Sequence, residues 1–298
     1  MASEKLSVVI GVPPSIWNIF DEEARARLLN SHPNVTMEAE TDPERFAEKV
    51  LQADGAMAFN YQIPKEALKQ GSRLRWVHSI PAGVDKLLTP ELVAAEHVAI
   101  TASKGPHAPL IAEHMVLLML SLARDMPTLV KDQENHRWSR DDERGGVPRL
   151  STQMLGKTIA ILGVGQIGDN FARMCKVGFG MNVLGMSRTT RDIKHVDRYF
   201  KRSELHEALG EADVVALCLA LTSSTRGIIG KAEFEAMKPT SFLINTARGG
   251  LIDEDALVNA MNTGMIGGTA LDTVDAEPLP ENSPLWDLPN TIITPHVA

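Results

Sequence analysis

The sequence predicts a two-domain α/β protein in which parallel sheets are covered by helices. The 298 residues are enough to bury two cores of ordinary size. Short apolar runs bounded by turn residues alternate with helix-compatible stretches along most of the chain, and this alternation is typical of parallel strands joined by helices. Apolar residues make up 44% and charged residues 23% of the chain, so a globular body is expected rather than a disordered one.

The first predicted domain spans residues 1–102. Its expected strands are short apolar runs at residues 7–12, 55–59, 75–79 and 98–101. Helices are expected between those runs, at residues 21–29 and 43–51. One α/β unit accounts for this part of the chain.

The second predicted domain spans residues 103–295. It opens with the strongest helical pattern of the chain, at residues 108–124, and continues with a polar segment at 131–149 that we interpret as a helix end and a loop. A further helix is expected at residues 166–176. The expected strands are residues 157–162, 182–185, 214–219, 242–245 and 268–271. A doubly wound sheet is therefore expected.

Three glycines follow the first strand of the second domain directly. Gly163, Gly165 and Gly168 have the spacing that allows a tight turn, close approach of the backbone to a pyrophosphate, and close packing of the next helix on the strand. The backbone amides of Gln166 and Ile167, at the start of that helix, complement phosphate charge. The pattern predicts a dinucleotide site; the alternative is a glycine-rich turn that binds no ligand.

The end of the next strand indicates which dinucleotide is bound. An Asp or Glu there would accept hydrogen bonds from a ribose 2′-hydroxyl and repel a 2′-phosphate, but this chain has Ser187, Arg188 and Thr189. The two hydroxyl groups can donate hydrogen bonds, and the guanidinium, together with Arg191, can pair with a phosphate dianion. We therefore predict that NADPH is preferred and that NADH can also be used. The alternative is that Arg188 is an ordinary solvated residue.

Three later segments carry groups suited to acid–base chemistry on a bound substrate. Arg248 stands in a glycine turn after an apolar strand, Asp272 and Glu277 follow the next strand, and His296 follows a Thr-Pro pair. A guanidinium can hold a carboxylate and stabilise charge on a carbonyl oxygen. An imidazole is the commonest proton donor, and a neighbouring carboxylate orients it and stabilises the imidazolium. We predict Arg248 as the anchor, Glu277 as the orienting group and His296 as the general acid.

These segments closely resemble the D-isomer-specific 2-hydroxyacid dehydrogenases, and among them the glyoxylate and hydroxypyruvate reductase type. Further motifs that carry the resemblance are Ala82-Gly83-Val84-Asp85, Ala112-Glu113-His114, Leu155-Gly156-Lys157-Thr158 and Met237-Lys238-Pro239. The resemblance implies a flavodoxin-like substrate domain, made of residues 1–102 and a return segment beyond 296, with an inserted Rossmann dinucleotide-binding domain. It also implies an active site in the cleft between the domains and a homodimer built on the cofactor domains and the long helix.

The resemblance assigns further roles within the site. Asp272 matches the family position that contacts the nicotinamide carboxamide, and the backbone amides of Ala82 and Gly83 match the loop that binds the substrate carboxylate. Hydride would pass from the nicotinamide to the keto carbon while His296 delivers a proton. We therefore expect NADPH-dependent reduction of a small 2-oxo acid, such as glyoxylate or hydroxypyruvate, to the D-2-hydroxy acid.

Two other functions fit parts of this pattern. A dinucleotide-sensing binding protein is one, because the family resembles transcriptional corepressors that keep the same fold and catalytic residues. Phosphoglycerate dehydrogenase is the other, although it would usually have an acidic ribose-binding residue and often an added regulatory domain. Formate dehydrogenase is disfavoured, because its histidine is partnered by glutamine whereas this chain has Glu277.

Charge and composition exclude several other classes of function. The formal net charge is -8, which gives no general attraction for nucleic acid or an anionic membrane. Residues 1–12 lack the pattern of a secretory signal, the apolar run at 115–123 is too short to cross a bilayer, and the two cysteines have no metal-ligand spacing. We therefore expect a cytoplasmic protein with no metal, nucleic-acid or membrane partner.

The last residue of the sequence, Ala298, lies close to the predicted acid. Free chain ends normally fray, and a fraying segment would not hold His296 in place. We therefore expect the natural protein to continue beyond Ala298 with the segment that returns to the first domain.

Overall fold

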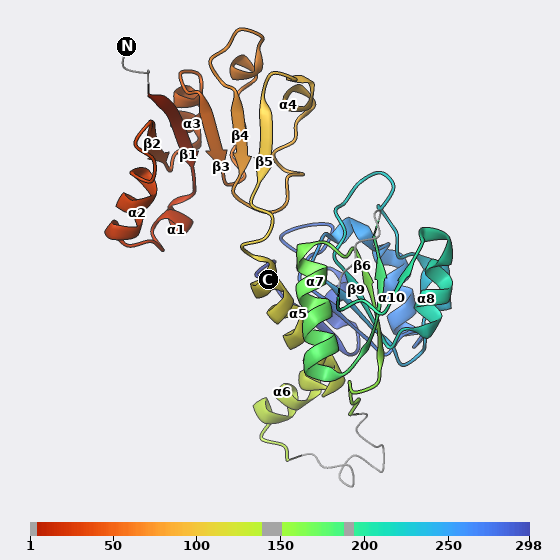
Figure 1. The fold of residues 1–298 in the computed structure, drawn as a ribbon. Helices are drawn as coiled ribbons and strands as arrows, with labels where there is room; N and C mark the ends of the chain where they lie inside the picture. Colours follow the sequence, from red (N-terminus) through yellow and green to blue (C-terminus); the bar gives the residue numbers. More distant parts are fainter. Residues whose placement is uncertain (1–4, 139–150, 188–193) are drawn as a thin grey trace. The chain divides into compact units, whose positions relative to one another are not determined.

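The computed structural model describes residues 5–138, 151–187 and 194–298, which belong to two compact units (Figure 1). The N-terminal unit is Met1–Pro106 and the C-terminal unit is His107–Ala298. Each is an α/β body built on one parallel sheet, so the predicted fold class is confirmed. The predicted boundary lies after residue 102, and the assignment of substrate and cofactor to the two domains stays a prediction.

The N-terminal unit contains a five-stranded parallel sheet in the order β2-β1-β3-β4-β5, which is a flavodoxin-like order. Its strands are β1 (Leu6–Gly11), β2 (Val35–Glu40), β3 (Gly55–Ala58), β4 (Trp76–Ser79) and β5 (Ala99–Ala102). Its helices are α1 (Pro14–Trp17), α2 (Glu22–Leu29), α3 (Pro43–Val50), the 3₁₀ turn η1 (Lys65–Leu68) and α4 (Pro90–Ala94).

A side-chain cap and a buried face fix α3 in this unit. The Asp42 carboxylate accepts hydrogen bonds from the amides of Glu44 and Arg45, both at 2.9 Å, and so satisfies the first turn of the helix. The opposite face buries Phe46 and Val50 completely in the core of the unit. Burial of this apolar surface holds the helix on the sheet.

The C-terminal unit contains a seven-stranded parallel sheet in the order β12-β11-β10-β9-β6-β7-β8, which is a Rossmann order with one added strand. The strands are β6 (Thr158–Leu162), β7 (Asn182–Met186), β8 (Arg198–Phe200), β9 (Val214–Leu217), β10 (Phe242–Asn245), β11 (Gly268–Leu271) and β12 (Thr291–Ile293). The α-helices are α5 (Ala108–Ala123), α6 (Met126–Glu134), α7 (Gln166–Arg173), α8 (Leu205–Glu211), α9 (Lys231–Ala236) and α10 (Glu254–Asn262). Shorter helical segments are the π-helix η3 (Met174–Gly178) and the 3₁₀ turns η4 (Arg202–Glu204), η5 (Gly249–Leu251) and η6 (Pro284–Asp287).

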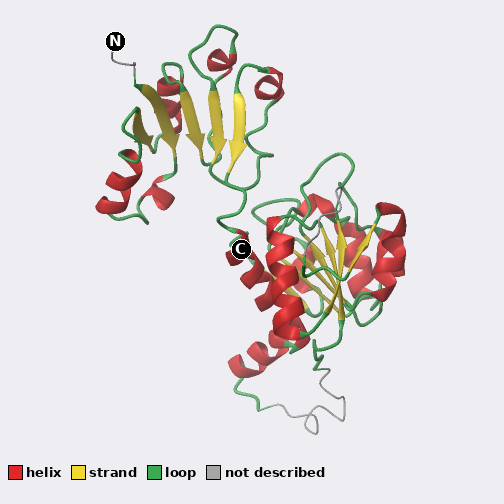
Figure 2. Ribbon diagram, viewed as in Figure 1, coloured by secondary structure: helices red, strands yellow, loops and turns green. Residues whose placement is uncertain are grey.

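This sheet separates two apolar cores, because successive side chains of a strand point to opposite faces. On β6, Ile159 and Ile161 belong to the core shared with α5 and α7, whereas Ala160 and Leu162 belong to the core shared with α8, α9 and α10. Figure 2 shows the helices of this unit on both sides of its strands. A sheet buried on both faces exposes its strand ends, where loops can carry function.

Most predicted elements lie within a few residues of their observed bounds, but three strands were not expected. β2 alternates polar and apolar residues with little burial, and β8 and β12 have only three residues each. None of the three forms the apolar run by which the other strands are recognised. The helix expected at 166–176 is also interrupted, since α7 ends at Arg173 and a π-helix follows.

Among the described residues, no helix has both the length and the apolar character that a bilayer span requires.

Candidate active site

The predicted pyrophosphate-binding and catalytic residues of the C-terminal unit follow four strands of one sheet. The glycine turn follows β6, Arg248 follows β10, Asp272 and Glu277 follow β11, and His296 follows β12. Because all these strands are parallel, their carboxyl ends share one edge of the sheet. In doubly wound sheets that edge is where ligands bind, beside the point at which the strand order reverses, here between β6 and β9.

The glycine turn is built from positions that exclude larger residues. Gly163 has a φ of +107°, and a Cβ there would lie 2.6 Å from the carbonyl oxygen of Cys218. A Cβ on Gly168 would collide with the carbonyl oxygen of Gly163, so α7 packs directly on the end of β6. Both glycines are therefore required by close backbone contacts.

The same turn fits a dinucleotide pyrophosphate. A Cβ placed on Gly165 would meet no atom within 4 Å, so open space lies beside the N-cap of α7. The first turn of a helix leaves its amides without intrahelical acceptors, and here they belong to Gln166, Ile167 and Gly168. Open space facing unpaired amides suits an anionic group.

The residues predicted to choose the cofactor are described only in part. Ser187 follows β7 directly and is half-buried. Arg188 and Thr189 lie outside the described residues, as does Arg191.

The turn that carries Arg248 is held by its own backbone and by Asn245. The fully buried Asn245 side chain donates to the carbonyl oxygen of Arg248 at 2.9 Å and accepts from the amide of Ala247 at 3.1 Å. A Cβ on Gly249 would overlap the backbone of Val274, so this turn lies directly against the loop that continues to Glu277. The guanidinium donates to the carbonyl oxygen of Ala247 at 2.6 Å.

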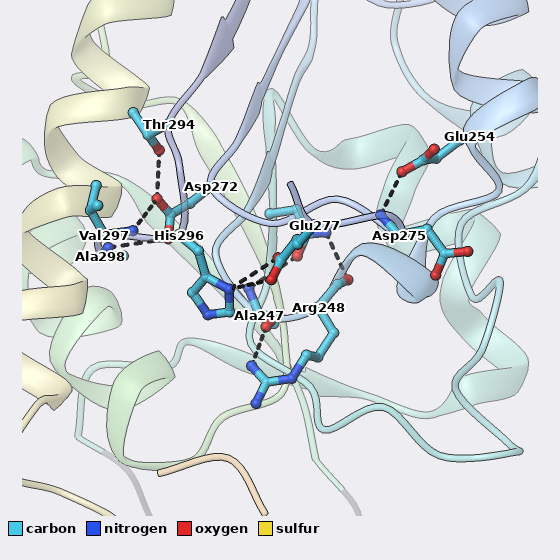
Figure 3. A network of polar contacts seen from close by, with 11 residues as sticks. Ala247, Arg248, Glu254, Asp272, Asp275, Glu277, Thr294, His296, Val297 and Ala298 are labelled. Carbon is cyan, nitrogen blue, oxygen red and sulfur yellow. Dashed lines mark hydrogen bonds and ion pairs between the residues drawn. The ribbon is translucent and has the colours of Figure 1, made fainter. Parts of the chain in front are cut away.

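Glu277 and His296 form a hydrogen-bonded pair (Figure 3). The Nδ1 atom of His296 lies 3.0 Å and 2.9 Å from the two carboxylate oxygens of Glu277, so Nδ1–H donates to the carboxylate. The side chains are 41% and 30% exposed, which leaves the other ring nitrogen, Nε2, accessible to a substrate. Figure 3 shows the imidazole and the Arg248 guanidinium extending to the same side of their loops. This arrangement can donate a proton beside a cation.

Asp272 is fully buried and fastens the segment that carries His296. Its carboxylate accepts hydrogen bonds from the Thr294 hydroxyl at 2.6 Å, the Val297 amide at 3.0 Å and the Ala298 amide at 3.1 Å. Its carbonyl oxygen accepts from the His296 amide at 2.9 Å. The residues around His296 are thus tied to the end of β11, and contact of Asp272 with a nicotinamide carboxamide stays a prediction.

Ala82 and Gly83 belong to the N-terminal unit, in the loop that follows β4. Ser79, the last residue of β4, is 2% exposed, and its hydroxyl lies 2.9 Å from the carbonyl oxygen of Pro81 and 3.0 Å from that of Gly83. Across a trans peptide the carbonyl and the next amide point in opposite directions, so the amides of Ala82 and Val84 point away from Ser79. This geometry leaves outward amides that can bind an anion.

His78 lies beside that loop and is engaged through both ring nitrogens. Nδ1 is 2.8 Å from the Thr101 hydroxyl and Nε2 is 2.9 Å from the Ser103 hydroxyl. Burial lowers the pKa of His78 from its usual value, which favours the neutral ring. These contacts point to a structural role.

Two residues of the site were not predicted as functional from the sequence. Thr294 binds Asp272. His114 of α5, which was assigned no functional role from the sequence, lies 3.2 Å from the Thr294 hydroxyl and 3.6 Å from Asp272. The sequence signal for His114 was its place in the Ala112-Glu113-His114 motif, which assigned it no functional role.

Known proteins resemble the chain over nearly its whole length. The protein-family model for the D-isomer specific 2-hydroxyacid dehydrogenase NAD binding domain matches residues 116–298 of the sequence. Glyoxylate/hydroxypyruvate reductase B of Pectobacterium carotovorum is 32% identical over 93% of this chain and 85% of its own. Glyoxylate reductase of Pyrococcus furiosus is 30% identical over 99% of this chain and 85% of its own. The solved structure of a D-isomer specific 2-hydroxyacid dehydrogenase family protein from Aeromonas salmonicida matches with a TM-score of 0.81 at 30% identity, covering 99% of this chain and 89% of the other.

A proton donor and a dinucleotide-compatible glycine turn on the same edge of a doubly wound sheet are the arrangement of a nicotinamide-dependent oxidoreductase. The sequence matches show which family of these oxidoreductases is present: the chain belongs to the D-isomer specific 2-hydroxyacid dehydrogenases. It is an NAD(P)-dependent enzyme of that family, as predicted from the sequence.

Proposed function

We propose that this enzyme uses NADPH to reduce a small 2-oxo acid, glyoxylate or hydroxypyruvate, to the D-2-hydroxy acid. The observation that carries the proposal is the contact between His296 Nδ1 and both oxygens of Glu277, which leaves Nε2 as the proton-donating atom. The names of the two relatives, both glyoxylate reductases, support this substrate class.

The chain's own residues supply everything except the hydride. When bound, the reduced nicotinamide provides a hydride for the keto carbon. The Arg248 guanidinium binds the substrate carboxylate and stabilises the charge that grows on the keto oxygen. His296 Nε2 gives its proton to that oxygen, and Glu277 holds the ring in place and stabilises the imidazolium before transfer. The neutral imidazole then regains a proton from water.

The test is turnover with a panel of 2-oxo acids and both cofactors. Wild-type protein is expected to oxidise NADPH in the presence of glyoxylate or hydroxypyruvate. Hydroxypyruvate should give the D product, as read by chiral chromatography, whereas glyoxylate gives an achiral 2-hydroxy acid. A protein that binds NADPH but reduces no 2-oxo acid in the panel would instead favour a dinucleotide sensor.

We expect kcat/KM with NADPH to exceed kcat/KM with NADH, and Arg188→Ala to reduce this preference. Loss of a charge-assisted contact to the 2′-phosphate should lower kcat/KM with NADPH by about tenfold or more and leave NADH almost unchanged. Steady-state kinetics with each cofactor measure both values. Arg202→Ala, at an exposed arginine of η4, is the matched control. Equal losses with both cofactors would contradict the assignment.

The loop after β4 is the proposed site for the substrate carboxylate. The amides of Ala82 and Gly83 are the pair that the family resemblance assigns, and the contacts of Ser79 support an outward direction for the Ala82 amide. We expect Ser79→Ala to raise KM for the 2-oxo acid by roughly threefold to tenfold, because the loop loses the hydroxyl that orients its carbonyls. KM for NADPH should change little, and Ser79→Thr should restore the wild-type value. In the control, Ser72→Ala, the lost hydroxyl binds the Ala67 carbonyl at 2.7 Å. An unchanged substrate KM in Ser79→Ala would rule out this role.

The proposal also includes a homodimer. Large apolar side chains of the C-terminal unit are exposed on and beside α5, where the sequence resemblance implies the interface; they are Leu110, Leu117 and Val177. Burial of these side chains by a second copy would remove apolar surface from water. A cytoplasmic location stays a prediction.

A further inference from the structure

The general acid of the proposed reaction stands in a strained position of the main chain. His296 has a φ of +55°, in the left-handed region that a residue with a Cβ adopts rarely. Such a conformation persists when neighbouring contacts hold it. The contacts in question are those of Asp272, whose carbonyl oxygen binds the His296 amide and whose carboxylate binds the Val297 and Ala298 amides.

Asp272 is in turn oriented by a chain of hydrogen bonds that begins on α5. A carboxylate only accepts hydrogen bonds, so the Thr294 hydroxyl, 2.6 Å from Oδ1, donates its single proton to Asp272. The contact of 3.2 Å between His114 Nε2 and the same hydroxyl must then run the other way, with the imidazole N–H donating. The three side chains form one directed relay, from His114 through Thr294 to Asp272.

Because the carboxylate of Asp272 is buried, its orientation depends on the hydrogen-bond donors of this relay. The Asp272 side chain is 0% exposed and the His114 side chain is 14% exposed, and His114 Nε2 lies 3.6 Å from Asp272 Oδ1. A buried carboxylate is tolerated only where donors surround it, and loss of one donor lets it turn toward others. Rotation of this carboxylate would release the amides of Val297 and Ala298, and with them the backbone next to the acid.

We infer that His114 and Thr294 are positioning residues for proton transfer, acting through Asp272 to hold the main chain of His296 so that its ring meets both Glu277 and the substrate. This rests on the proposed role of His296 as the general acid. Neither residue touches the reacting atoms in this scheme. Their effect is on geometry, and a displacement of about 1 Å at a reacting group can cost on the order of 100-fold in rate.

The test compares Thr294→Val, which keeps the shape of the side chain and removes the hydroxyl, with Thr294→Ser, which keeps the hydroxyl. Thr294→Val is expected to lower kcat by about tenfold to 100-fold and to raise the solvent deuterium isotope effect on kcat, because proton delivery becomes slower. Thr294→Ser should recover most of the loss. The dissociation constant for NADPH should change far less than kcat.

His114→Leu tests the relay from its other end and leaves the bond from Thr294 to Asp272 available. It should change kcat and the isotope effect in the same direction. Thr291→Val is the matched control, since it lies on the same strand β12 and its hydroxyl binds the carbonyl oxygen of Pro289 at 3.0 Å. The control should keep the wild-type isotope effect.

Wild-type kcat and isotope effect in His114→Leu would overturn the inference, even if Thr294→Val fails to fold. An equal loss of kcat in Thr294→Val and Thr291→Val, with an unchanged isotope effect, would overturn it as well. The His296→Asn variant separates this result from the proposed function. If His296→Asn keeps wild-type kcat, the general acid is misassigned and both proposals fall; if it is inactive while the His114 and Thr294 variants behave as wild type, only the positioning role falls.

Discussion

Replacing His296 with asparagine is expected to lower kcat for 2-oxo acid reduction by roughly 10²–10⁴-fold, because the proton donor is removed. Asparagine suits this position, since it tolerates the left-handed conformation that His296 adopts at a φ of +55°. The fold should therefore survive. The loss is measured from initial rates of NADPH consumption, with thermal unfolding as the check on structure.

The chain contains a second histidine–glutamate pair that serves as a matched control. His206 Nε2 lies 3.0 Å from Glu233, and the His206 side chain is 57% exposed on the surface of the same unit. The variant His206→Asn should keep close to wild-type kcat. If both histidine variants lose activity alike, the effect would arise from general disruption and not from loss of the acid.

Replacing Arg248 with lysine is expected to lower kcat/KM by at least about 10²–10³-fold, the range seen when one donor to a developing oxyanion is lost. Lysine keeps the charge but not the planar fork that can address a carboxylate and a carbonyl oxygen together. Both KM for the 2-oxo acid and kcat should therefore worsen. Steady-state kinetics with saturating NADPH measure the two separately.

Arg226→Lys is the control for this change. Arg226 is an exposed arginine whose guanidinium lies 3.8 Å from the Asp275 carboxylate, in the region next to the Arg248 turn. Its replacement should leave kcat/KM nearly unchanged. A fully active Arg248→Lys enzyme would show that a point charge is enough for catalysis. The simultaneous contact of the guanidinium with the substrate carboxylate and the keto oxygen would then no longer be part of the mechanism.

The part of the site that follows the strands could be predicted because a parallel sheet brings its carboxyl ends together. Once the apolar runs before Gly163, Arg248 and Asp272 are recognised as strands, their loops must share one edge. The glycine spacing could be read directly from the sequence. The approach of Glu277 to His296 was expected from the family resemblance, and the shared sheet edge is consistent with it.

The hydrogen bonds by which His114, Thr294 and Asp272 hold the segment around His296 could not be predicted in the same way. The relay through His114 depends on how α5 packs beside β12, and no local pattern encodes the contact of side chains that are 180 residues apart. β12 itself was missed because three residues are too few to show a period. The fastening of the final segment by Asp272 likewise depends on the three-dimensional position of Val297 and Ala298.

Gly249 fixes the distance between the loop that carries Arg248 and the loop that leads to Glu277. The loop bearing the anchor and the loop leading to the orienting carboxylate meet there main chain to main chain, with no side chain between them. Their spacing is consequently set by van der Waals contact between the two main chains, which depends little on the identity of neighbouring core side chains. The distance between the two loops should therefore change little when surrounding residues are replaced, whereas any side chain at position 249 would push the loops apart.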